Sequence, residues 1–243
     1  MSMKRKILGR RTSGIDTARV LIVMPVPLNY NADIRAAAFC AGAVSRNIAV
    51  WGPIPSRNAE DARNLQFIDG LNAKPRFTHF FLLDADTFPY DPYMIEKLLR
   101  HNKDVVAGPT PTQRQGKDKW NFKAFDYATV EFDERFHKYW NIVVDDGKGK
   151  GRSLRRSDDS MIDELPKKMF RAKYVGGTGI LIKRSVIEAL PEPYQLTLRD
   201  IHGKTMLSED YYFCEQITTH GYDIWVDPEL KSGHNNSVDI GKY

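Results

Sequence analysis

The chain of 243 residues contains only two cysteines and no apolar run long enough to cross a bilayer. Cys40 and Cys214 are too far apart to form a paired metal motif, so we expect buried free thiols in a reducing compartment. The longest apolar runs, 20–27 and 80–83, have the length of a strand, whereas a transmembrane helix needs about 20 apolar residues. No long apolar stretch follows the basic N-terminus, so a secretory signal is not expected and we predict a cytoplasmic location.

A strong excess of one charge is also absent, because 36 basic and 31 acidic residues leave a formal charge of +5. The composition is that of an ordinary globular protein, and the length fits one large domain, which we place at 19–243. Basic residues gather in an N-terminal arm, 1–18, and in the stretch 148–173. They could attract a phosphate-bearing partner such as nucleic acid or anionic lipid, but a solvated tail and a solvated loop are the simpler interpretation.

The first half of the chain alternates strand-like and helix-like segments. Residues 19–24 form a β-branched, apolar run that ends at Pro25, which is typical of a buried parallel strand. Helical patterns at 34–44, from a cap at Ser56 or Asn58 through Leu71, and at 92–99 alternate with strand-like runs at 47–51, 78–83 and 104–108. This alternation predicts an α/β domain with a mainly parallel sheet.

The second half has a different character. Aromatic and polar residues alternate over 122–132 and 136–144, which predicts antiparallel strands or a hairpin, and the polar stretch 145–168 predicts a long surface loop. We further expect a strand over 173–183 that is interrupted by glycines, helices over 185–190 and 208–220, and a last strand over 223–226.

Two carboxylates, Asp84 and Asp86, follow directly on the apolar strand that ends at Leu83. Ligands collect at such strand ends in open α/β sheets. Alternate residues of an extended segment point the same way, so both carboxylates can face one ion while Ala85 points elsewhere. Hard oxygen ligands suit Mg²⁺ or Mn²⁺, and these ions commonly bridge carboxylates to substrate phosphates. A solvated turn is the alternative when Asp-x-Asp is considered alone.

Two further segments carry candidate chemistry. Glu209 and Asp210 follow Ser208, a plausible helix N-cap, and carboxylates in a first helical turn also simply favour the helix dipole. Their functional interpretation is Asp210 as a general base that takes the proton of an acceptor hydroxyl, with Glu209 as an orienting neighbour. His234 lies after Gly233 in a polar segment, and a neutral imidazole would suit Mn²⁺ as a third ligand beside two Asp side chains.

The order of these features resembles the GT-A glycosyltransferases, especially the small family-two-like group of bacteria and phages. The resemblance covers roughly 19–234, and its motifs, each weak alone, occur in the family's order. The matching segments are Val23-Met24-Pro25, Ala62-Arg63-Asn64, Leu82-Leu83-Asp84-Ala85-Asp86, residues 175–182, residues 208–214 and residues 221–227 leading to Gly233-His234.

The resemblance implies a fold, a reaction and a set of site residues. The fold would be a Rossmann-like mixed sheet flanked by helices with a small antiparallel acceptor-side sheet, divided into a nucleotide-binding half, 19–110, and an acceptor-binding half, 111–243. The donor would be a UDP- or GDP-type sugar, and the acceptor a hydroxyl of a glycan, a protein or a modified nucleic acid. Nucleotide-sugar contacts would come from Pro25, Arg63, Asn64, Asp84, Ala85, Asp86 and Gly177; metal ligands would be Asp84, Asp86 and His234; catalytic residues would be Asp210 and Glu209.

Several alternatives remain open at this point. A retaining GT-A enzyme would use the same metal site, and the basic stretches could direct a glycosyltransferase to DNA. A sugar-nucleotide pyrophosphorylase is disfavoured because the positions after the first strand, 25–30, lack a glycine-rich phosphate loop. A metal nuclease or phosphatase would usually carry more acidic or histidine residues on the first strand. The non-enzyme alternative is a nucleic-acid-binding module that uses 4–11 and 148–156, although no helix-turn-helix, zinc-finger or RNP-type pattern accompanies these stretches.

Overall fold

The computed structural model describes residues 18–28, 31–56, 58–114, 137–140, 142–145, 151–153 and 166–234. Nearly all of the basic arm, the predicted strand 122–132 and most of the predicted loop 145–168 lie outside these residues. Inside that predicted loop, Gly151–Ser153 instead forms strand β11, because it pairs antiparallel with β10 (Ile142–Asp145).

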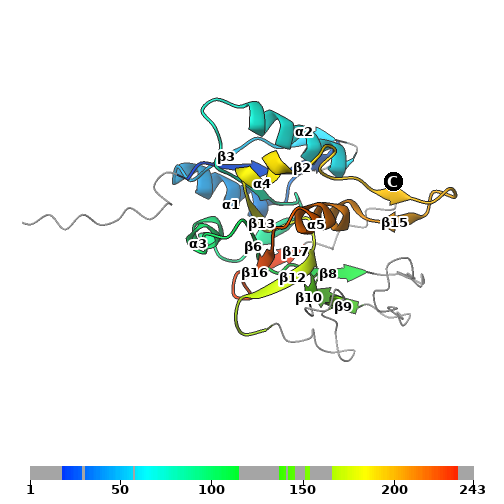
Figure 1. Ribbon diagram of the computed structural model, residues 1–243. Coiled ribbons are helices and arrows are strands. Elements are labelled where there is room, and N and C mark those ends of the chain that lie inside the picture. Colours follow the sequence, from blue (N-terminus) through cyan, green and yellow to red (C-terminus); the bar gives the residue numbers. More distant parts are fainter. Residues whose placement is uncertain are drawn as a thin grey trace, which may run out of the picture.

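A nine-stranded sheet forms the centre of the fold, with helices packed against it (Figure 1). The order across the sheet is β11-β10-β12-β16-β7-β13-β5-β1-β3. The remaining strands of this sheet are β1 (Val20–Val23), β3 (Ala49–Trp51), β5 (His79–Leu82), β7 (Val105–Ala107), β12 (Phe170–Val175), β13 (Ile180–Lys183) and β16 (Ile224–Val226). The α/β fold class with a mixed sheet, expected from the sequence, is confirmed.

The prediction of a mainly parallel sheet is wrong at the centre. β1 does pair in parallel with both β3 and β5, as the first half of the sequence indicates. However, β13 lies between β5 and β7 and is antiparallel to both. The alternation of strands and helices in the first half could not reveal this insertion, because β13 comes from the second half of the chain.

Each face of the sheet has its own core, and the period-two alternation of β5 decides which residues enter which. Phe80 and Leu82 pack on the face covered by α2 (Ala59–Asn72), α4 (Arg184–Ala189) and α5 (Glu209–Thr219). Phe81 packs on the opposite face, against α1 (Ile34–Ser45) and α3 (Met94–Arg100). Each core holds one of the two cysteines, and both are buried free thiols, as expected. The central strands β5, β7 and β13 are therefore buried on both faces of the sheet, which leaves the strand ends as the accessible part.

Four small two-stranded sheets complete the described fold. β2 (Pro25–Pro27) pairs in parallel with β4 (Ile54–Ser56), while β6 (Thr87–Pro89) pairs antiparallel with β17 (Ser232–His234). β8 (Pro111–Arg114) pairs antiparallel with β9 (His137–Trp140), and β14 (Leu198–Arg199) with β15 (Thr205–Leu207). Antiparallel pairing in the second half agrees with the prediction from its aromatic–polar alternation.

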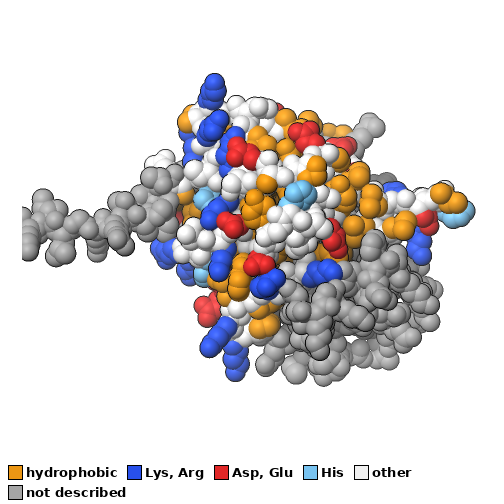
Figure 2. All heavy atoms as spheres, in the orientation of Figure 1, with side chains coloured by type: hydrophobic (Ala, Val, Ile, Leu, Met, Phe, Trp, Pro, Cys, Tyr) orange, Lys and Arg blue, Asp and Glu red, His pale blue; other side chains and the backbone are white. Residues whose placement is uncertain are grey.

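The β14–β15 hairpin projects from the body of the protein (Figure 1), and Figure 2 shows hydrophobic and basic side chains at its end. Ile201, at the turn of this hairpin, is 96% exposed. Among the described residues, no helix combines the length and the apolar character needed to span a membrane.

Candidate active site

The candidate site lies at the carboxyl ends of β1 and β5, where the strand order reverses. From β1 the chain passes outward to β3, and it then returns to the other side of β1 as β5. Such a switch point is where open α/β sheets bind ligands. The end of β1 leads into Pro25, which is buried in β2, and the end of β5 leads into Asp84. Both residues therefore lie where the sequence analysis places a nucleotide site.

The Asp84-Ala85-Asp86 segment forms a turn that separates its carboxylates from the alanine. The N–H of Asp84 donates to Thr178 Oγ1 at 3.0 Å, and the carbonyl of Asp84 accepts the N–H of Thr87 at 3.1 Å. Ala85 is only 4% exposed, belongs to the α1-side core and accepts the N–H of Asp33 at the start of α1. The turn is thus fixed to the core through Ala85, and the Asp84 and Asp86 side chains stay 30% and 24% exposed, on a turn and not on the extended segment expected from the sequence.

Asp86 meets His234 through the pairing of β6 with β17. In this ribbon Thr87 lies opposite His234, so the residue before Thr87 comes next to the imidazole. Nε2 of His234 lies 3.2 Å from Oδ2 of Asp86, and both side chains remain about one-quarter exposed. Two of the three predicted metal ligands are therefore adjacent and reachable from solvent.

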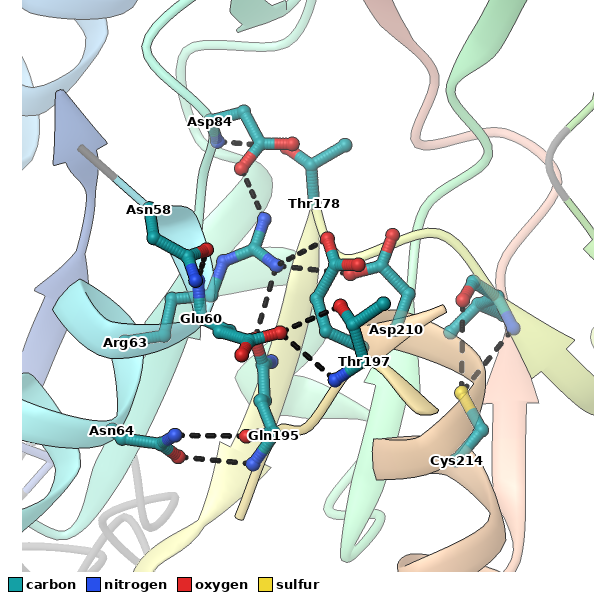
Figure 3. A network of polar contacts seen from close by, with 12 residues as sticks. Asn58, Glu60, Arg63, Asn64, Asp84, Thr178, Gln195, Thr197, Asp210 and Cys214 are labelled. Atoms are coloured by element: carbon teal, nitrogen blue, oxygen red, sulfur yellow. Dashed lines mark hydrogen bonds and ion pairs between the residues drawn. The ribbon is translucent and has the colours of Figure 1, made fainter. Parts of the chain in front are cut away.

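Asp84 is held by an arginine that also holds the two carboxylates at the start of α5 (Figure 3). Nη2 of Arg63 donates to Oδ1 of Asp84, and Nη1 donates to Oδ1 of Asp210 at 2.9 Å and lies 3.8 Å from Oε1 of Glu209. The Arg63 side chain is only 3% exposed. Although burial alone would lower its pKa, the surrounding carboxylates outweigh that effect and raise it, so the guanidinium stays charged.

Two carboxylates of this cluster, Asp84 and Glu209, have a raised pKa. Burial raises the pKa of Asp84, Arg63 acts in the opposite direction, and the nearby Asp210 and Asp86 raise it further. Burial and the adjacent Asp210 likewise raise the pKa of Glu209. Two carboxylates with raised pKa values in one partly exposed cluster are typical of functional sites. Ser208 occupies the N-cap position of α5 as predicted, but its side chain makes no capping hydrogen bond.

The raised pKa of Glu209 makes the stability of the protein depend on pH. A carboxyl whose pKa is higher in the folded state than in the unfolded state costs stability as pH rises through the interval between the two values. We therefore expect Glu209→Gln to raise the melting temperature at pH 7.5 by a few degrees, with the gain shrinking as pH falls toward 4.5. Differential scanning calorimetry over this range checks the prediction. Glu229→Gln, at an exposed loop position, should change the melting temperature at neither pH.

The oxygen and nitrogen ligands and the charge at the site fit a divalent cation, although the described residues form no preformed cage. Three carboxylates, those of Asp84, Glu209 and Asp210, lie within 4 Å of the single positive charge of Arg63. Asp86 is a fourth acidic group nearby, so the site has an excess of negative charge. Carboxylate oxygens and a neutral imidazole suit Mn²⁺, and carboxylates alone suit Mg²⁺. In the part of the chain that is described, no three His, Cys, Asp or Glu side chains are grouped as a metal site. Asp84 is directed to Arg63 and not to the Asp86–His234 pair.

Gly177 is needed because the Arg63–Asp210 ion pair occupies the space beside it. It lies between β12 and β13, and a Cβ at this position would come within 2.0 Å of Oδ1 of Asp210 and 2.6 Å of Nη1 of Arg63. Gly177 is predicted from the sequence to contact the nucleotide-sugar, and the packing of the ion pair against it is a further reason for a glycine at this position. Gly179, in the same segment, has a φ of 72°.

Gly177→Ala should therefore disturb the site directly. We expect a loss of about 1–3 kcal/mol in the free energy of unfolding, typical of an overpacked core, with a larger loss of any activity, because Asp210 or Arg63 must move. Urea unfolding measures the first effect. Gly52→Ala is the matched control, because a Cβ at Gly52 meets nothing within 4 Å. Equal stability of the two variants would contradict the packing argument.

Asn64, expected to face the nucleotide, uses both polar atoms of its side chain on the backbone of Gln195. Nδ2 donates to the Gln195 carbonyl at 2.8 Å, and Oδ1 accepts the Gln195 N–H at 2.9 Å. The side chain of Gln195 is fully buried, and its Oε1 accepts from Nη1 of Arg63 at 3.1 Å. Sequence reasoning missed Gln195 and Thr178. Gln195 lies in an irregular segment without periodicity, and Thr178 stands out only through its glycine neighbours.

Comparisons with known proteins give similarity only at the level of solved structures. No family model matches the chain, and no match was found among curated proteins. The crystal structure of A197 from STIV is 18% identical, with a TM-score of 0.49, over 89% of this chain and 85% of that one. GalNAc-T7 with UDP, GalNAc and Mn²⁺ is 9% identical, with a TM-score of 0.48, over 93% of this chain and 45% of that one. The inositol-1-phosphate CTP transferase from T. maritima is 9% identical, with a TM-score of 0.38, over 89% and 88% of the two chains.

Proposed function

We propose that this protein is a metal-dependent glycosyltransferase of the GT-A type. It would move a sugar from a UDP- or GDP-type donor to a hydroxyl group of a glycan, a protein or a modified nucleic acid. One observation carries the proposal. Asp84, just after β5, lies in one partly exposed cluster with Glu209 and Asp210, at the start of α5, and this cluster is beside the switch point of the sheet. Donor phosphate chemistry and acceptor proton transfer need acidic groups within one substrate length, and this cluster supplies both.

In this proposal the donor binds over the ends of β1 and β5. Pro25 and its neighbours line the base pocket, and the turn around Ala85 faces the ribose and the diphosphate. Asp86 and His234, with Asp84 beside them, would hold Mn²⁺ or Mg²⁺, and a cation held there would supply Lewis-acid stabilisation of negative charge on the departing diphosphate. Residues 19–110 form the donor half, and residues 111–243, with the segment 145–168, form the acceptor half.

Asp210 is the proposed base of an inverting displacement. The acceptor oxygen forms a bond to the anomeric carbon, the bond from that carbon to the diphosphate oxygen breaks, and the acceptor proton passes to the Asp210 carboxylate. The contact of Asp210 with Arg63 uses Oδ1. In this scheme Oδ2 receives the proton, and Glu209, in the same helical turn, orients the acceptor. A retaining reaction on the same metal site, or a DNA acceptor, would leave the donor half of the scheme unchanged.

A nucleotide screen tests the proposal. Purified protein is heated with UDP, GDP, ADP or CDP at a concentration about 100 times a micromolar Kd, with Mn²⁺, with Mg²⁺ or with EDTA. Binding at that excess contributes about 2.7 kcal/mol, which corresponds to a rise of roughly 5–10 °C for a chain of this length. We expect one diphosphate to stabilise the protein and EDTA to remove the effect. The matching nucleotide-sugar should then release free UDP or GDP without sugar phosphate. If none of the four nucleoside diphosphates stabilised the protein in a metal-dependent manner, the proposal would be refuted.

A further inference from the structure

Helix α2 presents three polar side chains to the acceptor-side segment that leads into the β14–β15 hairpin (Figure 3). Oε2 of Glu60 accepts the N–H of Thr197 at 2.8 Å and its hydroxyl at 2.6 Å. Asn64 makes its paired bonds to the backbone of Gln195. Positions 60, 63 and 64 lie on one side of a helix, so α2 binds this segment along a full helical turn.

Arg63 is the central member of this contact, and its two terminal nitrogens point to opposite halves of the proposed site. Nη2 reaches Asp84 on the donor side, and Nη1 reaches Asp210 and Gln195 on the acceptor side. A guanidinium is planar, so its bonds to two separate carboxylates fix the direction between them. At 3% exposure, Arg63 is enclosed by these partners and offers little surface to a nucleotide.

Gln195 is bound through both its backbone and its side chain, although it lies outside regular secondary structure. Asn64 binds its backbone N–H and its carbonyl, and its side chain is fully buried with Oε1 on Nη1 of Arg63. The Oε1 atom of Gln195 therefore accepts a hydrogen bond from Nη1 of Arg63 that a further carboxylate could otherwise accept. Nη1 therefore has a neutral acceptor, which adds no negative charge, beside the Asp210 carboxylate.

We propose that Arg63 is a positioning residue that holds Asp84 and Asp210 at a fixed separation, and that Gln195 sets the orientation of its guanidinium. This inference rests on the proposed function, because Asp84 and Asp210 are assigned there to the donor and to the acceptor. It differs from the nucleotide contact that the resemblance implies for Arg63. Without the arginine, carboxylates from β5 and α5 would repel one another, and the base would lose its place relative to the donor.

The test compares Arg63→Lys and Gln195→Met with the wild-type chain. Lysine keeps the charge but cannot bridge two carboxylates as a fork, and methionine keeps the volume of glutamine but removes Oε1. The probe for binding is UDP or GDP, whichever stabilises the wild-type protein, with Mn²⁺ in a calorimeter. The turnover assay is diphosphate release from the corresponding nucleotide-glucose. We expect both variants to bind the diphosphate within about threefold of wild type while turnover at saturating donor falls at least tenfold.

Gln195→Glu supplies a readout that a purely structural role would not move. A further carboxylate beside Nη1 of Arg63 adds negative charge to the cluster, so the acidic limb of the turnover–pH profile should shift to higher pH. Gln66→Met is the control, because Gln66 is a buried glutamine of the same helix that donates to the Gly52 carbonyl, away from the cluster. Its turnover and pH profile should match those of wild type.

The possible outcomes separate the two proposals. If the wild-type chain neither binds a diphosphate nor releases one, the proposed function fails. If wild type is active but Arg63→Lys or Gln195→Met weakens diphosphate binding tenfold with normal saturated turnover, Arg63 is a nucleotide ligand and the positioning role is overturned. Unchanged turnover, or an unshifted profile for Gln195→Glu, overturns it as well. Should Arg63→Lys fail to fold, the two Gln195 variants decide the question.

Discussion

Asp86→Ala is expected to abolish sugar transfer and the metal-dependent part of nucleotide binding. Asp86 is one of the two adjacent side chains that are proposed to bind the metal. The other, His234, lies 3.2 Å away on β17, which pairs with β6. Lewis-acid stabilisation of a leaving group is worth several kcal/mol, so its loss corresponds to a fall in turnover of roughly 10³-fold or more. Isothermal titration with UDP or GDP, with and without Mn²⁺, checks the binding part, and diphosphate release checks the turnover.

The fold should tolerate this change, because the Asp86 side chain is about one-quarter exposed and the turn is anchored through Ala85. A matched control is Asp69→Ala, at an exposed position of α2, which should behave as wild type in both assays. If Asp86→Ala still bound the diphosphate in an Mn²⁺-dependent manner and turned over normally, the metal assignment would have to be abandoned.

Asp210→Asn is expected to separate binding from chemistry. Asparagine keeps the shape of the side chain, and its Oδ1 can still accept from Nη1 of Arg63, so the cluster should stay assembled. The amide cannot take a proton, and general-base catalysis typically contributes 10²–10⁴-fold, so turnover should fall by about that factor. Diphosphate affinity should remain within about threefold, measured in the same titration.

Glu209→Gln provides the comparison within the same helical turn. Because Glu209 is assigned an orienting role, its loss of turnover should be clearly smaller than that of Asp210→Asn. Near-normal turnover of Asp210→Asn would exclude the inverting base. The stereochemistry of the product, read by proton NMR, would then decide whether the reaction proceeds with retention.

The parts of the fold that local patterns govern could be predicted from the sequence. Apolar residues before Asp84 predict a buried strand, and β5 is that strand, with Asp84 just beyond its end. Period-two alternation predicts that Ala85 turns away from its acidic neighbours, and it is buried while they are not. Helix α2 begins at Asn58, whose side chain accepts the N–H of Glu60, as its residue type suggests.

Pairings between distant segments could not be predicted in this way. Nothing local indicates that β13 inserts between β5 and β7, or that β6 and β17 pair in the register that brings His234 to Asp86. The partners of Arg63 come from three segments that are 21 to 147 residues away, so the sequence identified the arginine but not the residues that it binds. Gln195 carries no local signal, because its importance arises only from the atoms that surround it.

The β14–β15 hairpin contacts the body of the protein at both of its ends. Thr197, just before β14, is bound by Glu60, and Leu207, at the end of β15, is buried directly before helix α5. The turn between them makes its hydrogen bonds internally, with Asp200 accepting the backbone N–H groups of His202 and Lys204. The length and composition of the hairpin can therefore be changed in a redesigned chain while Glu209 and Asp210, at the start of α5, keep their positions.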